Sequence, residues 1–417
     1  MQCTTFAYDG LGRLTNETET VPIGARGRTT AQTVRKSYTF DTAGNRRTMT
    51  VATTGGVNPA NYTVVYAYDG NNRLQTETRT PTTGAATVTT YLYDANGNQT
   101  RRQGPEGIET RTYDVFNRLR GVTLGNATTT YLYRPDGLRL SKASAGQTTM
   151  HVCDGANIVE ELNASGGMIS RFARGVNLIS ILDFQGERYY LFNANGDVVQ
   201  LAGVNGNVVR NYYYDAFGNE TNPAPNDRNP FRYKGDLGYY WDAEAGTYYL
   251  QMRHYNPFTS RMTSPDPYWN ISNMIYGSNP IQSTLGVLMP NIWAIRESGN
   301  LYVYAKSNPL RYWDPTEHSA VRITALNAPL GHPLYAPGAT NTNFPGGGPF
   351  PVGHPFHVPP SNSGPAPVAP QPRGGGSGGT LNNSGTIGTA VMGNNATVNN
   401  TGTILSLYMG NSATVPP

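Results

Sequence analysis

The sequence has very little cysteine. Its 417 residues include only Cys3 and Cys153, too few for a disulfide framework or for a zinc site built on cysteines. Two cysteines could still form one disulfide with each other, but two unpaired thiols are the simpler interpretation. His254 has no second histidine or cysteine at ligand spacing, so we expect it to be a hydrogen-bonded side chain. We expect no cofactor and no metal.

Long apolar runs are also absent. No stretch approaches the roughly 20 apolar residues that a membrane-spanning helix requires, and residues 1–9 lack the charged and apolar regions of a secretory signal. We therefore expect no transmembrane segment and see no signal peptide. If the protein leaves the cell, it uses another export route or belongs to a longer polypeptide.

Charge is sparse and mixed in sign. The 31 basic and 27 acidic residues include no basic run, which argues against nucleic acid as a partner. After Glu317 the sequence has no Asp, Glu or Lys, and only Arg322 and Arg373 are charged. Because acid–base and magnesium chemistry depend on carboxylates, we expect no catalytic domain in this C-terminal part.

Tyrosine, glycine and proline are abundant, with 28 Tyr, 48 Gly and 30 Pro. This composition favours many short strands separated by turns. Much of the tyrosine lies in a repeated aromatic-x-aromatic-Asp pattern, spaced mostly by about 20 to 30 residues, as in repeat architectures. The copies are Phe6–Asp9, Tyr38–Asp41, Tyr66–Asp69, Tyr91–Asp94, Arg111–Asp114 and Tyr212–Asp215, with weaker copies at Tyr131–Arg134, His151–Asp154 and Tyr190–Asn193.

Each copy predicts a β-hairpin. The two aromatics at positions i and i+2 share one face of a strand and can pack across the sheet. The Asp can accept hydrogen bonds from backbone amides two residues on, and a following Gly or Asn tolerates the positive φ of a tight reversal. A single hairpin is marginal in water, so neighbouring hairpins must stack to bury their tyrosine faces.

The stretch from Pro230 to Pro315 has a different motif string. It reads Ala245-Gly-Thr-Tyr-Tyr-Leu-Gln-Met-Arg-His-Tyr-Asn-Pro, then Ser264-Pro-Asp-Pro, then Asn300-Leu-Tyr-Val-Tyr-Ala-Lys-Ser-Asn-Pro, and ends at Asp314-Pro. This stretch resembles the Rhs-repeat-associated core that closes Rhs and YD-repeat proteins, and the repeats before it resemble YD repeats. The resemblance implies an all-β fold in which hairpins wind into a spiral around a hollow, with the core as its plug.

Full shells of that family use many more repeats than the nine or so found in this chain, so we expect a partial shell. The predicted regions are YD repeats over residues 1–229, the core over 230–316, a Pro/Gly-rich linker over 317–379 and a repeated tail over 380–417. In the tail, Asn382, Met392 and Ala396 recur as Asn399, Met409 and Ala413, each 17 residues later. This period predicts a short β-solenoid-like tail, which could self-associate.

In many members of the family the core is an aspartyl autoprotease that cuts the chain just downstream. The resemblance assigns the two carboxyl groups of that chemistry to Asp266 and Asp314, with Arg253 as the cation that holds a carboxylate ionised. Three positions depart from the self-cleaving pattern. Asn256 replaces an aspartate, and Glu317 and His318 occupy the places of a glycine and a leucine.

Four tryptophans lie in the core block, and we expect them to be packing anchors. They are Trp241, Trp269, Trp293 and Trp313.

These observations favour a non-catalytic scaffold, a fragment of an Rhs-type shell that encloses or displays a C-terminal segment. Its expected partners are its own C-terminal segment or a cargo polypeptide, and other components of a shell or secretion complex. Such proteins resemble bacterial polymorphic toxins, so a secreted or surface location is expected. Two alternatives stay open, a self-cleaving aspartyl protease and a surface adhesin that binds glycans through tyrosine-rich strands.

Overall fold

The computed structural model describes residues 3–23, 26, 30–56, 61–284, 286–314, 321–322, 374–375, 380–383, 386–392, 397–400 and 403–409. The chain divides into two compact units, Met1–Asn341 and Thr342–Pro417. The linker predicted over residues 317–379 lies outside the described residues, except for two short strands. So do Glu317 and His318.

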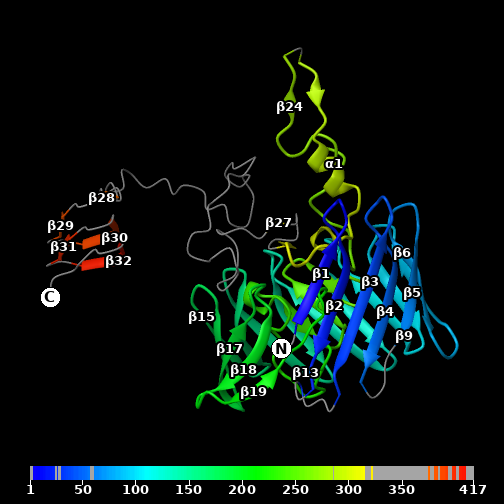
Figure 1. Cartoon of the computed structure of the whole chain (residues 1–417), viewed down its shortest axis with the longest axis horizontal. Coiled ribbons are helices and arrows are strands. Elements are labelled where there is room, and N and C mark those ends of the chain that lie inside the picture. The colour runs from blue at the N-terminus through cyan, green and yellow to red at the C-terminus, as the bar shows by residue number, and fades with distance from the viewer. Residues whose placement is uncertain are drawn as a thin grey trace. The chain divides into compact units, whose positions relative to one another are not determined.

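The first unit is built on one antiparallel sheet of 19 strands, in which each strand pairs with the next one along the chain (Figure 1). The strands are β1 (Cys3–Tyr8), β2 (Leu14–Val21), β3 (Gln32–Phe40), β4 (Arg46–Gly55), β5 (Tyr62–Tyr68), β6 (Leu74–Pro81), β7 (Thr87–Tyr93), β8 (Gln99–Gly104), β9 (Gly107–Tyr113), β10 (Leu119–Leu124), β11 (Ala127–Tyr133), β12 (Arg139–Ser144), β13 (Gln147–Asp154), β14 (Asn157–Asn163), β15 (Met168–Arg174), β16 (Leu178–Asp183), β17 (Gly186–Phe192), β18 (Val198–Gly203) and β19 (Val208–Asn211). The predicted all-β class and the antiparallel hairpins are confirmed.

The turns show why the register holds. In the first hairpin, the backbone N–H groups of Leu11 and Arg13 donate to Asp9 Oδ1 at 3.0 and 2.9 Å, and Gly12 adopts a φ of 78°. A side-chain oxygen that caps its own turn fixes which residues face each other across the hairpin. The same contact, from the amide four residues later, recurs at Asp41, Asp69, Asp94 and Asp114.

The paired aromatics lock each hairpin to its neighbour. The first aromatic of a pair is buried, as in Tyr38, Tyr66, Tyr91 and Tyr131. The hydroxyl of the second donates to a backbone carbonyl of the preceding hairpin, from Tyr68 to Arg46 at 2.8 Å, from Tyr113 to Gln99 at 3.1 Å and from Tyr133 to Leu119 at 2.8 Å. The aspartate of a repeat therefore shapes the turn, and the tyrosine directly before it joins its hairpin to the preceding hairpin.

Two tyrosines of β11, Tyr131 and Tyr133, allow this hydroxyl contact to be tested within one strand. Tyr133→Phe removes the hydroxyl that donates to Leu119, so we expect a loss of about 1 kcal/mol in the free energy of unfolding. Tyr131→Phe removes a buried hydroxyl that has no hydrogen-bond partner, so its effect should be near zero or stabilising. Urea unfolding of both variants measures the difference. Equal losses would show that the hydroxyl contact does not hold the hairpins together.

The core block and the residues just after it form short elements. They are η2 (Gly235–Leu237), β20 (Tyr240–Asp242), β21 (Thr247–Leu250), β22 (Arg253–Asn256), β23 (Arg261–Met262), β24 (Ile281–Gln282), β25 (Leu288–Met289), α1 (Ile292–Ser298), η3 (Ala305–Ser307), β26 (Tyr312–Trp313) and β27 (Val321–Arg322). β20 to β23 form a four-stranded antiparallel sheet. Within the described residues no helix has the length and apolar character needed to cross a membrane.

Apolar packing joins the core block to the strands. Phe231 and Tyr240 pack in one buried cluster with Phe172 and Ile181, and the rings of Phe172 and Phe231 meet edge to face at 4.8 Å. Edge-to-face aromatic pairs contribute beyond the area that they bury. The core block is therefore part of the hydrophobic core of the sheet.

A fully buried ion pair also joins the core block to the sheet. Arg139 begins β12 and Asp242 ends β20; both side chains are 0% exposed, and Arg139 Nη1 lies 2.5 Å from Asp242 Oδ2. The backbone N–H of Arg139 donates to the hydroxyl of Tyr249 at 3.0 Å. His254 shares a hydrogen bond of 3.0 Å with Thr247, and the prediction of a hydrogen-bonded side chain is confirmed.

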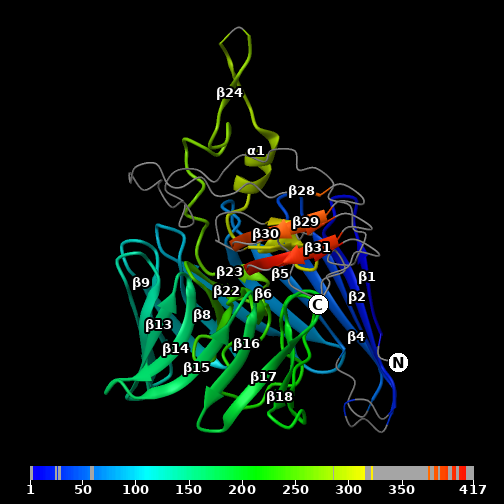
Figure 2. The same cartoon turned by 90° about the vertical axis from the view of Figure 1, so that its left-hand side faces the viewer.

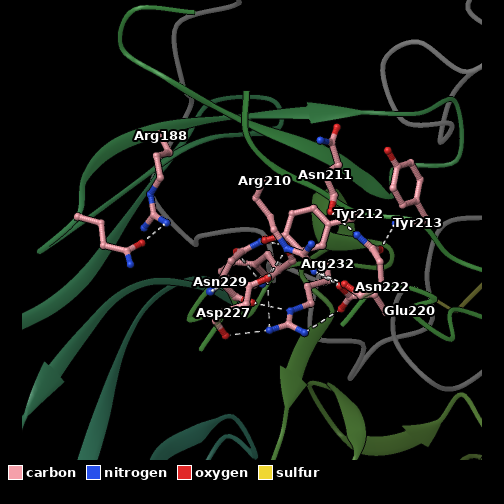
Figure 3. A network of polar contacts seen from close by, with 12 residues as sticks. Arg188, Arg210, Asn211, Tyr212, Tyr213, Glu220, Asn222, Asp227, Asn229 and Arg232 are labelled. Carbon is pink, nitrogen blue, oxygen red and sulfur yellow. Dashed lines mark hydrogen bonds and ion pairs between the residues drawn. The ribbon is translucent and has the colours of Figure 1, made fainter. Parts of the chain in front are cut away.

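Figure 3 shows the polar network where the chain passes from the last strand into the core block. Arg210 on β19 donates to Glu220 at 2.5 Å, and Arg232 donates to the same carboxylate at 2.9 Å. Asn229 donates to the hydroxyl of Tyr212 at 3.1 Å. These charge-assisted bonds tie the connecting segment to β19.

The described parts of the second unit are β28 (Gly374–Gly375), β29 (Thr380–Asn383), β30 (Thr386–Met392), β31 (Thr397–Asn400) and β32 (Thr403–Met409). They pair in parallel, β28 with β30, β30 with β32, and β29 with β31. Thr380 faces Thr397 and Thr386 faces Thr403, each 17 residues apart. The solenoid-like interpretation of the whole tail stays a prediction.

Candidate functional site

The three residues that the sequence singled out meet in the first unit. Arg253 Nη2 lies 3.1 Å from Asp314 Oδ2 and 3.4 Å from Asp266 Oδ2. Arg253 comes from β22, Asp266 follows β23, and Asp314 follows β26. One guanidinium therefore contacts a carboxylate from each of the two Asp-Pro motifs.

Backbone contacts fix the positions of Arg253 and Asp266. The carbonyl of Leu301 accepts from Arg253 Nη1 at 3.4 Å and from the N–H of Asp266 at 3.0 Å. Asp266 stands before Pro267, which holds its backbone extended. Its Oδ1 accepts from the N–H of Tyr268 at 2.9 Å, so one carboxylate oxygen caps a turn and the other faces Arg253.

Tyr239 holds the second aspartate. Its hydroxyl donates to the carbonyl of Asp314 at 3.2 Å and accepts from the N–H of Asp314 at 3.3 Å. Tyr239 also receives the hydroxyl of Tyr304 at 3.3 Å. The backbone of Asp314 is thereby fixed at the point where the predicted cut segment begins.

Burial sets the charge state of this site. Arg253 and Asp314 are buried, and Asp266 is partly buried. Burial raises the pKa of Asp266 to about 6, although the nearby Arg253 guanidinium lowers it, and the Asp314 carboxylate raises it further. The carboxyl group of Asp266 can therefore keep its proton up to about pH 6, well above the range of a free aspartate.

The site opens into a cleft of about 150 Å³. Leu11 and Arg13 of the first hairpin line it, together with Trp269, Arg296 and Lys306 of the core block. Sequence reasoning missed these five lining residues. Arg296 belongs to no motif, and its one signal is that it is a basic residue directly after a stretch without charge. Lys306 lies in the motif Asn300–Pro309, but that motif gave no sign of a cleft. Leu11 and Arg13 carry no signal because only the fold brings the first hairpin to the core.

The departure at Asn256 has a structural explanation. Its Oδ1 accepts from the N–H of Phe258 at 2.9 Å and of Thr259 at 3.3 Å. An amide oxygen caps a turn as well as a carboxylate oxygen does, and Asn256 is not among the residues that line the cleft. The asparagine at this position therefore removes no negative charge from the cleft that contains Asp266 and Asp314.

Among the residues that the structure describes, no group of three or more His, Cys, Asp or Glu is arranged to hold a metal ion. Cys3 and Cys153 are both free thiols. The tryptophan interpretation needs one correction. Trp293 is 63% exposed and is not a packing anchor, because α1 leaves this side chain outside the core.

Two bacterial proteins are similar to this chain over part of its length. The tRNA3(Ser)-specific nuclease WapA of Bacillus spizizenii is 31% identical and the tRNA nuclease WapA of Bacillus subtilis is 30% identical, each over 240 residues. The alignment covers 55% of this chain but only 9% of either relative. The chain thus spans less than a tenth of the length of these relatives.

Solved structures share the fold. The complex titled TcdB2-TccC3-Cdc42 matches with a TM-score of 0.54 at 20% identity, and TcdB2-TccC3 without its hypervariable C-terminal region matches with a TM-score of 0.52 at 19% identity. Each match covers 76% of this chain and 15% of the solved chain. No family model matches the sequence. The repeated hairpins, the paired Asp-Pro motifs and these comparisons together make the chain similar to Rhs/YD-repeat proteins, whose β-sheet shells are linked to polymorphic toxins.

Proposed function

We propose that this chain forms the closing part of an Rhs-type shell and encloses its own C-terminal segment or a cargo polypeptide. One observation carries the proposal: the core block contacts successive turns along one end of the sheet. Asn308 donates to the carbonyl of Gly12 at 2.6 Å, Asn300 to that of Ala43 at 3.0 Å, and Tyr302 to that of Gly97 at 2.8 Å. A segment bonded to three separate turns supports the proposal that the core block closes that end of the sheet.

The partners follow from the same proposal. The enclosed polypeptide is the chain's own segment after Asp314 or a cargo, and other components of a shell or secretion complex join it. The solved structures that share the fold are titled as TcdB2 with TccC3, which supports partners of this kind. The parallel strands β28 to β32 offer a further surface for self-association. A secreted or surface location in bacteria agrees with the Bacillus relatives.

Trypsin tests the enclosure, since the sequence beyond Glu317 has only Arg322 and Arg373 as cleavage sites. If the segment is enclosed, we expect both sites to be cut on the order of a hundredfold more slowly in the native chain than after unfolding in urea. The mass of the released peptides identifies each cut. Equal rates at Arg373 before and after unfolding would contradict enclosure.

Self-cleavage is the second candidate function, and the contacts of Arg253 with Asp266 and Asp314 favour it. In this chemistry, one ionised carboxylate takes a proton from water while the protonated partner donates to the leaving amide nitrogen. The water oxygen bonds to the peptide carbon and the peptide C–N bond breaks. Asp314 lies closer to the guanidinium and supplies the ionised group, and Asp266, with its raised pKa, supplies the proton.

The raised pKa predicts how cleavage depends on pH. The free-chain pKa of aspartate is about 3.9, and burial raises that of Asp266 to about 6. The protonated form is therefore stabilised by folding, and this contribution is complete below the free-chain value and is lost as pH rises through about 6. We expect the cleavage rate, measured after refolding at each pH, to fall about tenfold per pH unit above pH 6. A rate that stays flat across this pH range would exclude Asp266 as the acid.

A further inference from the structure

A protrusion leaves the core block between the two Asp-Pro motifs. Residues 267–295 contain the hairpin of β24 and β25 and the first part of α1, and they extend beyond the turns of the sheet in both views (Figures 1 and 2). The base of this protrusion is well anchored. The N–H of Asn291 donates to the carbonyl of Ile275 at 2.8 Å, and the hydroxyl of Ser298 donates to that of Met274 at 3.1 Å.

Many large apolar side chains of the protrusion face solvent. Ile271 is 89% exposed, Ile281 67% and Val287 63%. The other large apolar side chains exposed on it are Ile275, Leu288, Met289, Ile292, Trp293 and Ile295. Exposed apolar patches of this density on a soluble protein mark interaction sites.

Charge is absent from the same residues. From Pro267 to Ile295 the sequence has no Asp, Glu, Lys, Arg or His. The first charged residue is Arg296, in the last turn of α1, and it donates to the carbonyl of Leu11 at 3.3 Å. The protrusion therefore has an uncharged end, and charged side chains begin with Arg296 and Glu297 where it meets the sheet.

The hairpin carries exposed apolar side chains on both faces. Ile281 pairs with Met289 and Gln282 with Leu288. Successive side chains of a strand point to opposite faces, so Met289 and Leu288 lie on different sides of the hairpin. A flat protein surface would cover one face of such a hairpin and leave the other in water. A lipid phase surrounds the hairpin and covers both faces.

The order of side chains along the protrusion also fits a bilayer. Aliphatic residues occupy the hairpin, Trp293 lies on α1 at its base, and Arg296 follows one turn later. Tryptophan is enriched at the level of lipid headgroups, and a cation near the surface is attracted to anionic lipids. The geometry points to a lipid surface as the partner of this protrusion, with the β24–β25 hairpin inserted at the boundary between headgroups and acyl chains.

Vesicle flotation of the full chain tests this. The probe is a vesicle of equal parts phosphatidylcholine and phosphatidylglycerol, and the variant carries Ile281→Ser, Leu288→Ser and Met289→Ser. We expect the unchanged chain to float with the vesicles and the variant to lose at least about tenfold in affinity, because three aliphatic side chains no longer leave water. The matched control is Val115→Ser with Val176→Ser and Val204→Ser, three exposed valines in turns between strands of the sheet, which should float like the unchanged chain.

Two outcomes overturn the proposal. One is an unchanged chain that stays below the vesicles. The other is a hairpin variant that still floats as well as the control. Light scattering is run on the same samples. A dimer that the hairpin variant abolishes, without flotation, would assign the protrusion to a second copy of the chain. Thermal melting confirms that each variant is folded before its flotation is compared.

Discussion

Asp266→Asn is expected to slow self-cleavage by about 100- to 10,000-fold, the usual contribution of a group that transfers a proton in the transition state. The amide has no acidic proton to give, and it keeps the size of the side chain and the oxygen that caps Tyr268. The fold should therefore survive while the chemistry stops. Masses of the denatured chain, taken at intervals after refolding, give the fraction of cut chain.

Asp236→Asn is the matched control for this variant. Burial raises the pKa of Asp236 to about 6 as well, but Asp236 lies in η2 and accepts from the N–H of Leu178 at 3.3 Å, away from the cleft. Its replacement should leave the rate of cleavage unchanged. Equal rates for the Asp266 variant and the unchanged chain would remove Asp266 from the proposed chemistry.

Asp242→Asn is expected to cost about 3–5 kcal/mol of unfolding free energy, because it leaves Arg139 as an uncompensated charge in the core. Arg139 is fully buried and has its short contact with Asp242 Oδ2. The energy is large because water cannot reach the guanidinium once its partner is neutral. Urea unfolding monitored by circular dichroism measures the change.

The double variant Arg139→Leu with Asp242→Leu should recover most of that loss, since replacing both partners of a buried pair by apolar groups is often close to neutral. Arg171→Gln serves as the surface control. It breaks the exposed pair with Glu160, which has a distance of 2.7 Å, and should change stability by less than about 1 kcal/mol. A small loss for Asp242→Asn would mean that this ion pair is not needed to hold the core block on the sheet.

The hairpins could be predicted because their information is local. Asp9 caps its own turn, and the two aromatics of a repeat, two residues apart in sequence, share a face, so a short window contains both the turn and the buried side. Tyr133 shows the limit of this local information. Its bond to Leu119 joins two hairpins, and the sequence gives no sign that the second aromatic of each pair reaches a neighbour's backbone.

The packing of the core block could not be predicted, because it depends on pairs far apart in the chain. Arg139 and Asp242 are 103 residues apart, and no local pattern relates them. Trp293 shows a residue whose type predicted the wrong environment. Its size suggests a buried anchor, yet the helix that carries it lies on a protrusion where the chain leaves little to cover it.

The candidate site, too, could be predicted only in part from the sequence. Resemblance named Arg253, Asp266 and Asp314 by residue type, and the fold then brought these three side chains within contact distance. The cleft around them could not be foreseen, since Leu11 and Arg296 come from segments 285 residues apart. Asn256 illustrates why a motif alone misleads. Its departure from the pattern suggests a lost charge, and the contacts show a turn cap that an amide serves equally well.

The mass of the purified chain, measured under both native and denaturing conditions, tests the proposed function most directly. We predict two pieces in denaturant that separate shortly after Asp314, and one native species that contains both. A single full-length mass in denaturant would contradict self-cleavage at this site. A native mass without the C-terminal piece would contradict enclosure.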